Sequence, residues 1–209
     1  MKIAKTTIPD LLIGSIFYGT GGGGNPQEGE AIYRRITANK RSVELRSLQE
    51  FSDESLFITA YGVGSITAAG NPEKLVKKAY TMLAAYLGKE ISGVIPVEIG
   101  PKAVATAALV ASQLSLPLVD CDIVGGRSAP EVFLETITLF DLPRTPLVVI
   151  NGQGNAAILE SSPDGLFEEK FLRNFSTLTE SSQAYVLGYP LSKKILENMI
   201  SKTKLHEID

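Results

Sequence analysis

The sequence has very few of the residues on which several common chemistries depend. A single cysteine, Cys121, excludes an intrachain disulfide, and one unpaired thiol is typical of a reducing compartment. His206 is the only histidine and lies close to the end of the sequence. A histidine-based catalytic triad or a histidine-rich zinc site is therefore not expected.

Long hydrophobic runs and basic stripes are also missing. No apolar run reaches the ~20 residues that a membrane helix needs, and the first residues, Met1 to Lys5, lack an apolar signal core. The formal net charge is −3 at pH 7, and the basic residues form no stripe. We therefore expect a cytoplasmic protein that binds neither membranes nor nucleic acid.

The chain does have enough apolar residues for a sizeable core, since 44% of its 209 residues are hydrophobic. We expect a single α/β domain over residues 1–209. Its core is expected at about residues 8–160, and a helical C-terminal segment, residues 161–209, is expected to complete it.

Helical and strand patterns alternate along most of the sequence. Apolar spacing and caps predict helices at Ile8–Tyr18, Pro26–Ala38, Pro72–Leu87, Pro101–Leu114, Asp164–Asn174 and after Pro190. Gly88 is expected to end the third of these helices. Apolar runs predict strands at 43–46, 57–61, 94–100, 116–122, 132–140, 147–150, 156–159 and 184–187. The small residues Gly62 to Ser65 are predicted to form a loop after the second of these strands. This order predicts an α/β fold with three layers: a mostly parallel, mixed sheet with helices on both faces. The last pair before residue 160 reads as an antiparallel hairpin.

The most unusual stretch is the glycine loop, Gly21, Gly22, Gly23 and Gly24, followed by Asn25 and Pro26. Four consecutive glycines are costly inside a helix or strand, so they are predicted to form a loop between two helices. Asn25 is the expected N-cap of the second helix, with Glu28 as its capping partner. The exposed N–H groups of such a loop can bind an anion or a carbonyl group. The alternative is a flexible hinge.

Acidic residues and glycines follow two of the predicted strands. Glu98 and Gly100 end one strand, and Asp120 and Asp122 end the next. In parallel sheets, ligands bind beyond the carboxyl ends of the strands, so these residues are candidates for one site. The carboxylates could act as acid and base, or Asp120 and Asp122 could hold a divalent cation. Alternatively, they cap the following turns through the backbone.

A second loop adds Gly126, Arg127 and Glu131 to the candidate residues. The planar guanidinium of Arg127 is suited to hold a carboxylate or an imide carbonyl. It could equally form a buried pair with Glu131 or Asp122. Cys121 lies between two acids, which oppose thiolate formation, so a core position is expected for it.

Several ordered segments resemble the S-methyl-thiohydantoin desulfurase family, which is allied to hydantoinase and oxoprolinase proteins. The resemblance covers about residues 8–190, and its segments are 17–26, 96–100, 120–122, 126–131 and 151–155. It implies an α/β N-terminal domain followed by a β-rich domain. The implied activity is hydrolytic attack on a five-membered cyclic imide or thiohydantoin. This chain is expected to be one half of a split enzyme or a member that keeps only ligand binding.

Three functions are therefore expected as alternatives. In the first, the glycine loop stabilises negative charge, Arg127 orients a cyclic substrate, and Glu98, Asp120 or Asp122 is the base or holds a cation. In the second, the same loop binds a nucleotide or another phosphate ligand without catalysis. In the third, the chain is a structural subunit that docks a separate β-rich chain. A homo- or hetero-oligomer is expected in each case.

Overall fold

The computed structural model describes residues 1–39, 41–64, 72–128, 142, 144–162, 164–178 and 183–203. The helices are α1 (Ile8–Gly19), α2 (Pro26–Ala38), η1 (Leu48–Glu50, a 3₁₀ turn), α3 (Pro72–Leu87), α4 (Pro101–Leu114), α6 (Gly165–Thr177) and α7 (Lys193–Thr203). The strands are β1 (Lys2–Ile3), β2 (Val43–Ser47), β3 (Leu56–Gly64), β4 (Gly93–Ile95), β5 (Leu118–Asp120), β6 (Leu147–Asn151), β7 (Ala156–Leu159) and β8 (Gln183–Ser192).

The described strands form one eight-stranded mixed sheet in the order β1-β2-β5-β4-β3-β8-β6-β7. Strands β2, β5, β4 and β3 are parallel and form the centre of one half of the sheet. Strand β8 runs antiparallel to both β3 and β6, and β6 and β7 form the expected antiparallel hairpin. The carboxyl ends of the parallel strands therefore meet at one edge.

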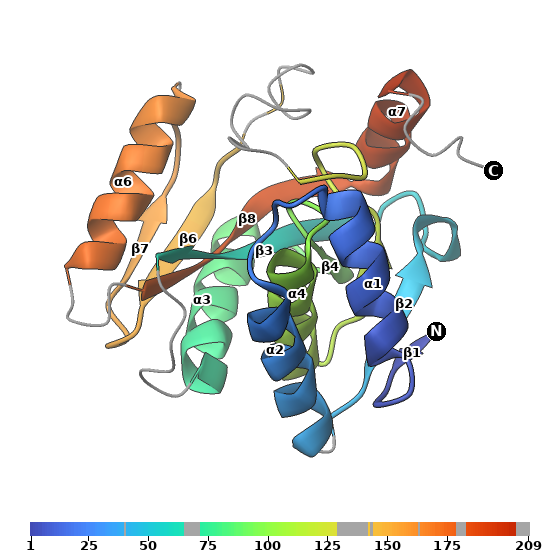
Figure 1. The fold of residues 1–209 in the computed structure, drawn as a ribbon. Coiled ribbons are helices and arrows are strands. Elements are labelled where there is room, and N and C mark those ends of the chain that lie inside the picture. Colours follow the sequence, from blue (N-terminus) through green and yellow to red (C-terminus); the bar gives the residue numbers. More distant parts are fainter. Residues whose placement is uncertain are drawn as a thin grey trace.

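Helices cover both faces of this sheet (Figure 1). Along β3, Ile58 and Ala60 pack into the cluster formed with α2, α3 and α4, while Phe57 packs on the opposite face with Leu196 of α7. Strand β6 alternates in the same way, because Leu147 and Val149 pack with Leu172 of α6. This two-residue alternation buries both faces of the sheet and gives the predicted three-layer α/β architecture.

Several predicted elements differ from the observed ones. Gly62 to Gly64 were expected to form a loop but belong to β3, where they pair with β8. The predicted strand 94–100 ends at Ile95, and the predicted strand 116–122 covers only Leu118–Asp120. In both places the chain leaves the sheet early and forms irregular segments at its carboxyl edge. The predicted strand 132–140 lies outside the described residues.

The segment after residue 160 contributes more than helices. Strand β8 spans ten residues and lies between β3 and β6 near the middle of the sheet. The helix predicted after Pro190 is confirmed as α7, which begins at Lys193, and Pro190 itself lies inside β8. Within the described part of the chain, no helix is both long enough and apolar enough to cross a membrane.

Candidate functional site

A cavity of about 540 Å³ lies at the carboxyl edge of the sheet. Helix α1 forms one side of it, and the chain segments that follow β4 and β5 form the other. Its described lining is Met1, Thr7, Asp10, Leu11, Gly14, Ser15, Tyr18, Leu45, Pro96, Ile99, Val104, Leu118, Val119, Asp120, Cys121, Asp122, Gly125 and Gly126. The walls are thus mainly apolar, with a few hydroxyl and carboxyl groups, as is usual for small-molecule sites.

Asp122 is buried and organises the loop that follows β5. Its Oδ1 accepts hydrogen bonds from the N–H groups of Gly125 at 3.2 Å and Gly126 at 3.0 Å, and its Oδ2 accepts from Gly126 at 2.8 Å. This is the turn-capping geometry expected as the alternative to a chemical role. Asp122 therefore holds two backbone amides at the cavity wall.

Asp120 differs from Asp122 although it lines the same cavity. Its side chain is exposed, and it makes no hydrogen bond or ion pair with any other described residue. Asp10, from the first turn of α1, has the same two properties and faces the cavity from another element. A carboxylate without such a partner keeps its lone pairs available for a ligand or a water molecule.

The glycine loop packs tightly against the start of α4. The Gly23 carbonyl accepts hydrogen bonds from the N–H groups of Lys102 at 3.0 Å and Ala103 at 3.1 Å, so the loop caps that helix. A Cβ on Gly23 would lie 2.3 Å from the Cα of Gly100, and one on Gly22 would lie 1.9 Å from Oγ of Ser128. Close approach of the Ser128 side chain and of the Gly100 backbone therefore explains the glycines at positions 22 and 23.

Part of the loop backbone still carries donors without acceptors. The Gly22 N–H donates to the Gly19 carbonyl at 2.7 Å, whereas those of Gly21, Gly23 and Gly24 have no acceptor among the described residues. Residues 21–25 are not among those that line the cavity. The expected cap is confirmed, since Oδ1 of Asn25 accepts from Gln27 N–H at 2.8 Å.

Hydrogen bonds join the glycine loop to the other segments singled out in the sequence. The Ser128 hydroxyl donates to the Gly19 carbonyl at 2.8 Å, and the Ile99 N–H donates to the Arg127 carbonyl at 2.8 Å. Gly100 lies directly against Gly23. The fold thus brings the glycine loop, residues 98–100 and residues 126–128 together next to the cavity.

The remaining predicted residues lie around this cluster. Glu98 is half-buried and is not part of the cavity lining. Arg127 is exposed, and its Nη1 donates to the carbonyl of Ser128 at 2.9 Å. Glu131 lies outside the described residues. Glu28, the expected capping partner, forms an ion pair with the half-buried Lys102.

Few side chains of this site could act as ligands of a metal ion. Among the described residues, no group of three or more histidine, cysteine, aspartate or glutamate side chains is placed to hold a metal ion. Asp120 and Asp122 would be the protein ligands of a divalent cation here. Asp122 already accepts hydrogen bonds from two backbone amides, so its oxygens would have to be shared.

Cys121 is buried next to the two aspartates, which confirms the expected core position. Burial, followed by the negative charges of Asp122 and Asp120, raises the pKa of its thiol far above the ordinary value. The thiol donates to the Asp122 carbonyl at 3.3 Å. Because only the thiolate is a good nucleophile, this residue is not suited to nucleophilic catalysis.

Residues of α1 and its N-cap, Thr7, complete the cavity, and they were not among the site residues expected from the sequence. Thr7, Leu11, Gly14, Ser15 and Tyr18 all line it. These positions recur at helical spacing and therefore share one side of the helix. That spacing was the available signal, but α1 is apolar on several sides, so the spacing alone does not indicate which side faces a cavity.

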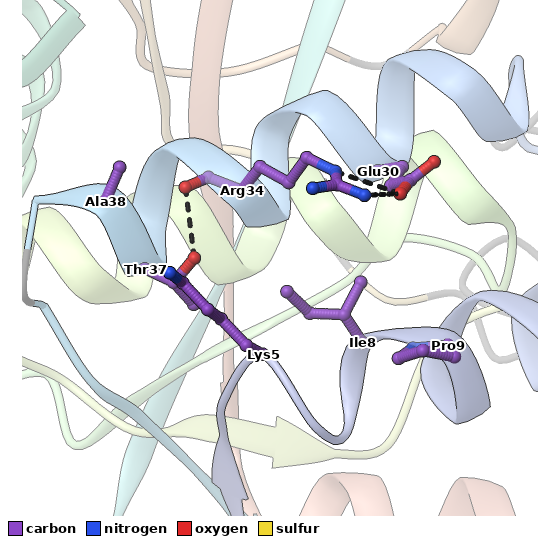
Figure 2. Close-up of a pocket in the computed structure, with 7 residues that line it drawn as sticks. All are labelled: Lys5, Ile8, Pro9, Glu30, Arg34, Thr37 and Ala38. Carbon is purple, nitrogen blue, oxygen red and sulfur yellow. Dashed lines mark hydrogen bonds and ion pairs between the residues drawn. The ribbon is translucent and has the colours of Figure 1, made fainter.

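A second cavity of about 320 Å³ lies between α1 and α2 (Figure 2). Its lining is Lys5, Ile8, Pro9, Glu30, Arg34, Thr37 and Ala38. The Arg34 guanidinium is engaged by Glu30, with hydrogen bonds of 2.9 and 2.6 Å. None of the residues selected from the sequence lies here, so this cavity is not the candidate site.

A buried polar cluster lies on the other face of the sheet, under α6. Glu168 accepts hydrogen bonds from the Tyr189 hydroxyl at 2.5 Å and from Nε of Arg144 at 3.0 Å. The Tyr61 and Tyr189 hydroxyls lie 3.2 Å apart. Burial raises the pKa of both tyrosines well above the ordinary value, so both stay protonated at neutral pH.

The fold and the cavity define an α/β protein with a small-molecule-sized site at the carboxyl edge of its sheet. The model of the S-Me-THD-like N-terminal domain matches residues 6–161. The chain therefore belongs to the S-Me-THD-like N-terminal domain family. A search of curated proteins finds no match.

The fold is similar to that of a protein from Chromobacterium violaceum whose X-ray crystal structure was determined by a structural genomics consortium. The TM-score is 0.79 at 21% sequence identity, and the match covers 95% of this chain. It covers 57% of the other chain, so the two proteins share only part of the longer one. At this identity the similarity establishes the fold.

Proposed function

We propose that the chain binds a small five-membered cyclic imide or thiohydantoin in the 540 Å³ cavity and, as one half of a split enzyme, contributes to its hydrolysis. The observation that carries the proposal is the placement of Asp120 and Asp122 in a largely apolar cavity at the carboxyl edge, in a member of the S-Me-THD-like family. Small-molecule sites span about 300–1,000 Å³, and this cavity falls in that range.

Asp120 is the proposed general base. It lines the cavity, is exposed and makes no hydrogen bond or ion pair with another described residue. Its carboxylate can accept a proton from a water molecule that attacks a ring carbonyl carbon, and can return that proton to the ring nitrogen as the C–N bond breaks. Asp122 has a positioning role, because it fixes the Gly125 and Gly126 amides. The Tyr18 hydroxyl, which has no hydrogen-bond partner among the described residues, is the proposed donor to a ring carbonyl.

The other predicted residues have roles only if the ligand extends beyond this cavity. The N–H groups of Gly21, Gly23 and Gly24 are then the proposed donors to a developing negative charge. Arg127 then orients the ligand, and Glu98 or Glu131 supplies a further acid. A divalent cation held by Asp120 and Asp122 remains an alternative to direct base catalysis.

The test compares single variants in binding and turnover. Titration calorimetry with hydantoin and a thiohydantoin should show binding to the wild type. Asp120→Asn should leave binding within a few-fold and remove turnover, measured with the β-rich partner chain present. Asp122→Asn should weaken binding, whereas Arg127→Ala should weaken it only for a ligand that extends beyond the cavity. Glu54→Gln, an exposed carboxylate away from the cavity, is the control. Unchanged turnover in Asp120→Asn would refute the assigned base.

Binding of a nucleotide or phosphate through the glycine loop is the competing proposal. The Gly21, Gly23 and Gly24 donors support it, but the described cavity lining includes three carboxylates and no lysine or arginine. A thermal-shift comparison of ATP and hydantoin separates the two. Stabilisation by ATP alone would favour the phosphate ligand.

A second candidate function is docking of a separate β-rich chain through the outer side of α1. Ile13, Ile16 and Phe17 lie at helical spacing and are 66%, 44% and 74% exposed. Exposed apolar patches of this kind mark interaction sites. Phe17→Ser should abolish association with the β-rich chain, measured by light scattering, without altering hydantoin binding. A wild-type chain that forms only homodimers, and loses them in Phe17→Ser, would show that the occupant is a second copy.

A further inference from the structure

The cavity at the carboxyl edge has an unbalanced charge. Asp10 enters its lining from α1, Asp120 from the end of β5, and Asp122 from the loop that follows. Among the described lining residues there is no lysine, arginine or histidine side chain. Negative side chains therefore reach the cavity from more than one element, and no cationic side chain of the described lining balances them.

The partners of these three carboxylates differ. Asp122 is buried and accepts hydrogen bonds from backbone amides, which compensate part of its charge. Asp10 and Asp120 are exposed and have no hydrogen-bond or ion-pair partner among the described residues. Met1 also lines the cavity, and its N-terminal ammonium, which donates to the Leu45 carbonyl at 2.7 Å, places one positive charge against the three carboxylates. Asp10 and Asp120 thus set the sign of the potential.

The apolar walls strengthen this effect. Leu11, Ile99 and Val119 surround the same space, and low-dielectric walls focus the field of nearby charges. An anionic group that enters would lose water and meet two like charges. An ammonium group would find two carboxylates that no described residue already engages. A neutral ring would occupy the apolar part in either case.

We propose that Asp10 and Asp120 select ligands by charge, so that the cavity accepts cyclic ligands with a neutral or cationic substituent and rejects those with a carboxylate or phosphate. This inference rests on the proposed function and specifies its substrate class. Asp10 is assigned here a specificity-determining role, separate from the proposed base Asp120.

The experiment uses two matched probe sets, so that the ring and the charge are tested separately. The first set is hydantoin with a methyl, an aminoethyl or a carboxymethyl group at position 5. The second is benzyl alcohol, benzylamine and benzoate, which lack the five-membered ring. Binding to the full chain is measured by titration calorimetry at pH 7, at low salt and at 0.5 M NaCl.

In the wild type, the ammonium member of a set should bind at least about tenfold more tightly than the carboxylate member, and salt should reduce this ratio. Asp10→Asn and Asp120→Asn should each lower the ratio, and the double variant should bring it close to one. Glu54→Gln should leave it unchanged. Circular dichroism should verify that each variant is folded.

The possible outcomes separate the two proposals. If the hydantoins do not bind but benzylamine is preferred over benzoate, and the double variant loses that preference, charge selection is supported and the cyclic imide substrate is wrong. Charge selection is overturned if carboxylate and ammonium members bind equally, if the preference persists in the folded double variant, or if no member of either set binds.

Discussion

Replacing Gly23 by alanine should destabilise the protein strongly, because two independent costs coincide at this residue. Its φ is +70°, and the left-handed conformation costs a non-glycine residue about 1–2 kcal/mol. The new Cβ would also lie 2.3 Å from the Gly100 Cα, a backbone atom that a side-chain rotation cannot move. Overpacking of this kind costs about 1–3 kcal/mol. The sum is a loss of about 2–5 kcal/mol in the free energy of unfolding.

Two other glycines provide matched controls. Gly21 lies in the same loop with φ +93°, but a Cβ there has no atom within 4 Å. Gly21→Ala should therefore cost only the conformational part, about 1–2 kcal/mol. Gly14, inside α1, also has nothing within 4 Å, and alanine there should stabilise the helix by about 0.5–1 kcal/mol. The difference between Gly23→Ala and Gly21→Ala isolates the contact with Gly100.

The measurement is chemical denaturation followed by circular dichroism, supported by thermal melts. For a domain of this size each kcal/mol shifts the Tm by roughly 2–4 °C, so Gly23→Ala should lower it by about 4–20 °C. Equal destabilisation by Gly21→Ala and Gly23→Ala would refute the argument, because only the second substitution creates the clash. A neutral Gly23→Ala would show that the loop moves away from α4 without cost.

Three further predictions concern the buried cluster, the cysteine and an exposed ion pair. Tyr189→Phe removes a hydrogen bond to the buried Glu168 carboxylate and should cost about 1.5–3 kcal/mol by denaturation, whereas Tyr80→Phe should be nearly neutral. The Cys121 thiol should react with Ellman's reagent only after unfolding; rapid reaction of the native protein would contradict its burial. Hydrogen bonds from Lys77 and Arg41 lower the pKa of Glu73. The stabilising contribution of Glu73 is therefore present above its unfolded-state pKa and is lost as the pH falls through its folded-state pKa. Glu73→Gln should flatten the plot of the free energy of unfolding against pH in that range.

Local signals in the sequence located most helix ends correctly. Pro26, Pro72 and Pro101 were expected as first helical residues, and α2, α3 and α4 begin at them. Gly88, expected to end a helix, follows α3 directly and has φ +61°. These signals act within a few residues, through a fixed proline φ or a tolerated positive φ. They therefore do not depend on the tertiary fold.

Strand ends were predicted less well because they depend on distant partners. Gly62 to Gly64 look like a loop from composition, but β8, more than one hundred residues later in the sequence, pairs with them and makes them a strand. The short strand predicted at 184–187 continues in the structure to Ser192, which pairs with Leu56 of β3. Tertiary pairing thus overrides local preference in both places.

The position of the two strand-end carboxylates was predictable from the sequence, but their hydrogen bonds were not. The order of strands and helices in the sequence is enough to place Asp120 and Asp122 at the carboxyl edge of the sheet, and both residues line the cavity there. The different partners of the two carboxylates were not predictable, since they depend on how the chain turns back at Gly125 and Gly126. The contribution of Asp10 requires knowing which side of α1 faces the sheet edge.

The glycine loop and the cavity depend on each other through α1. The last turn of α1 supplies Tyr18 to the cavity, and Gly19, next to it, is held by the Ser128 hydroxyl. A few residues later, the Gly23 carbonyl attaches the loop to the start of α4. These hydrogen bonds fix the position of α1 over the carboxyl edge and so determine the width of the cavity. A bulky residue at position 23 would displace α1, and the cavity would change shape although residue 23 is not part of its lining.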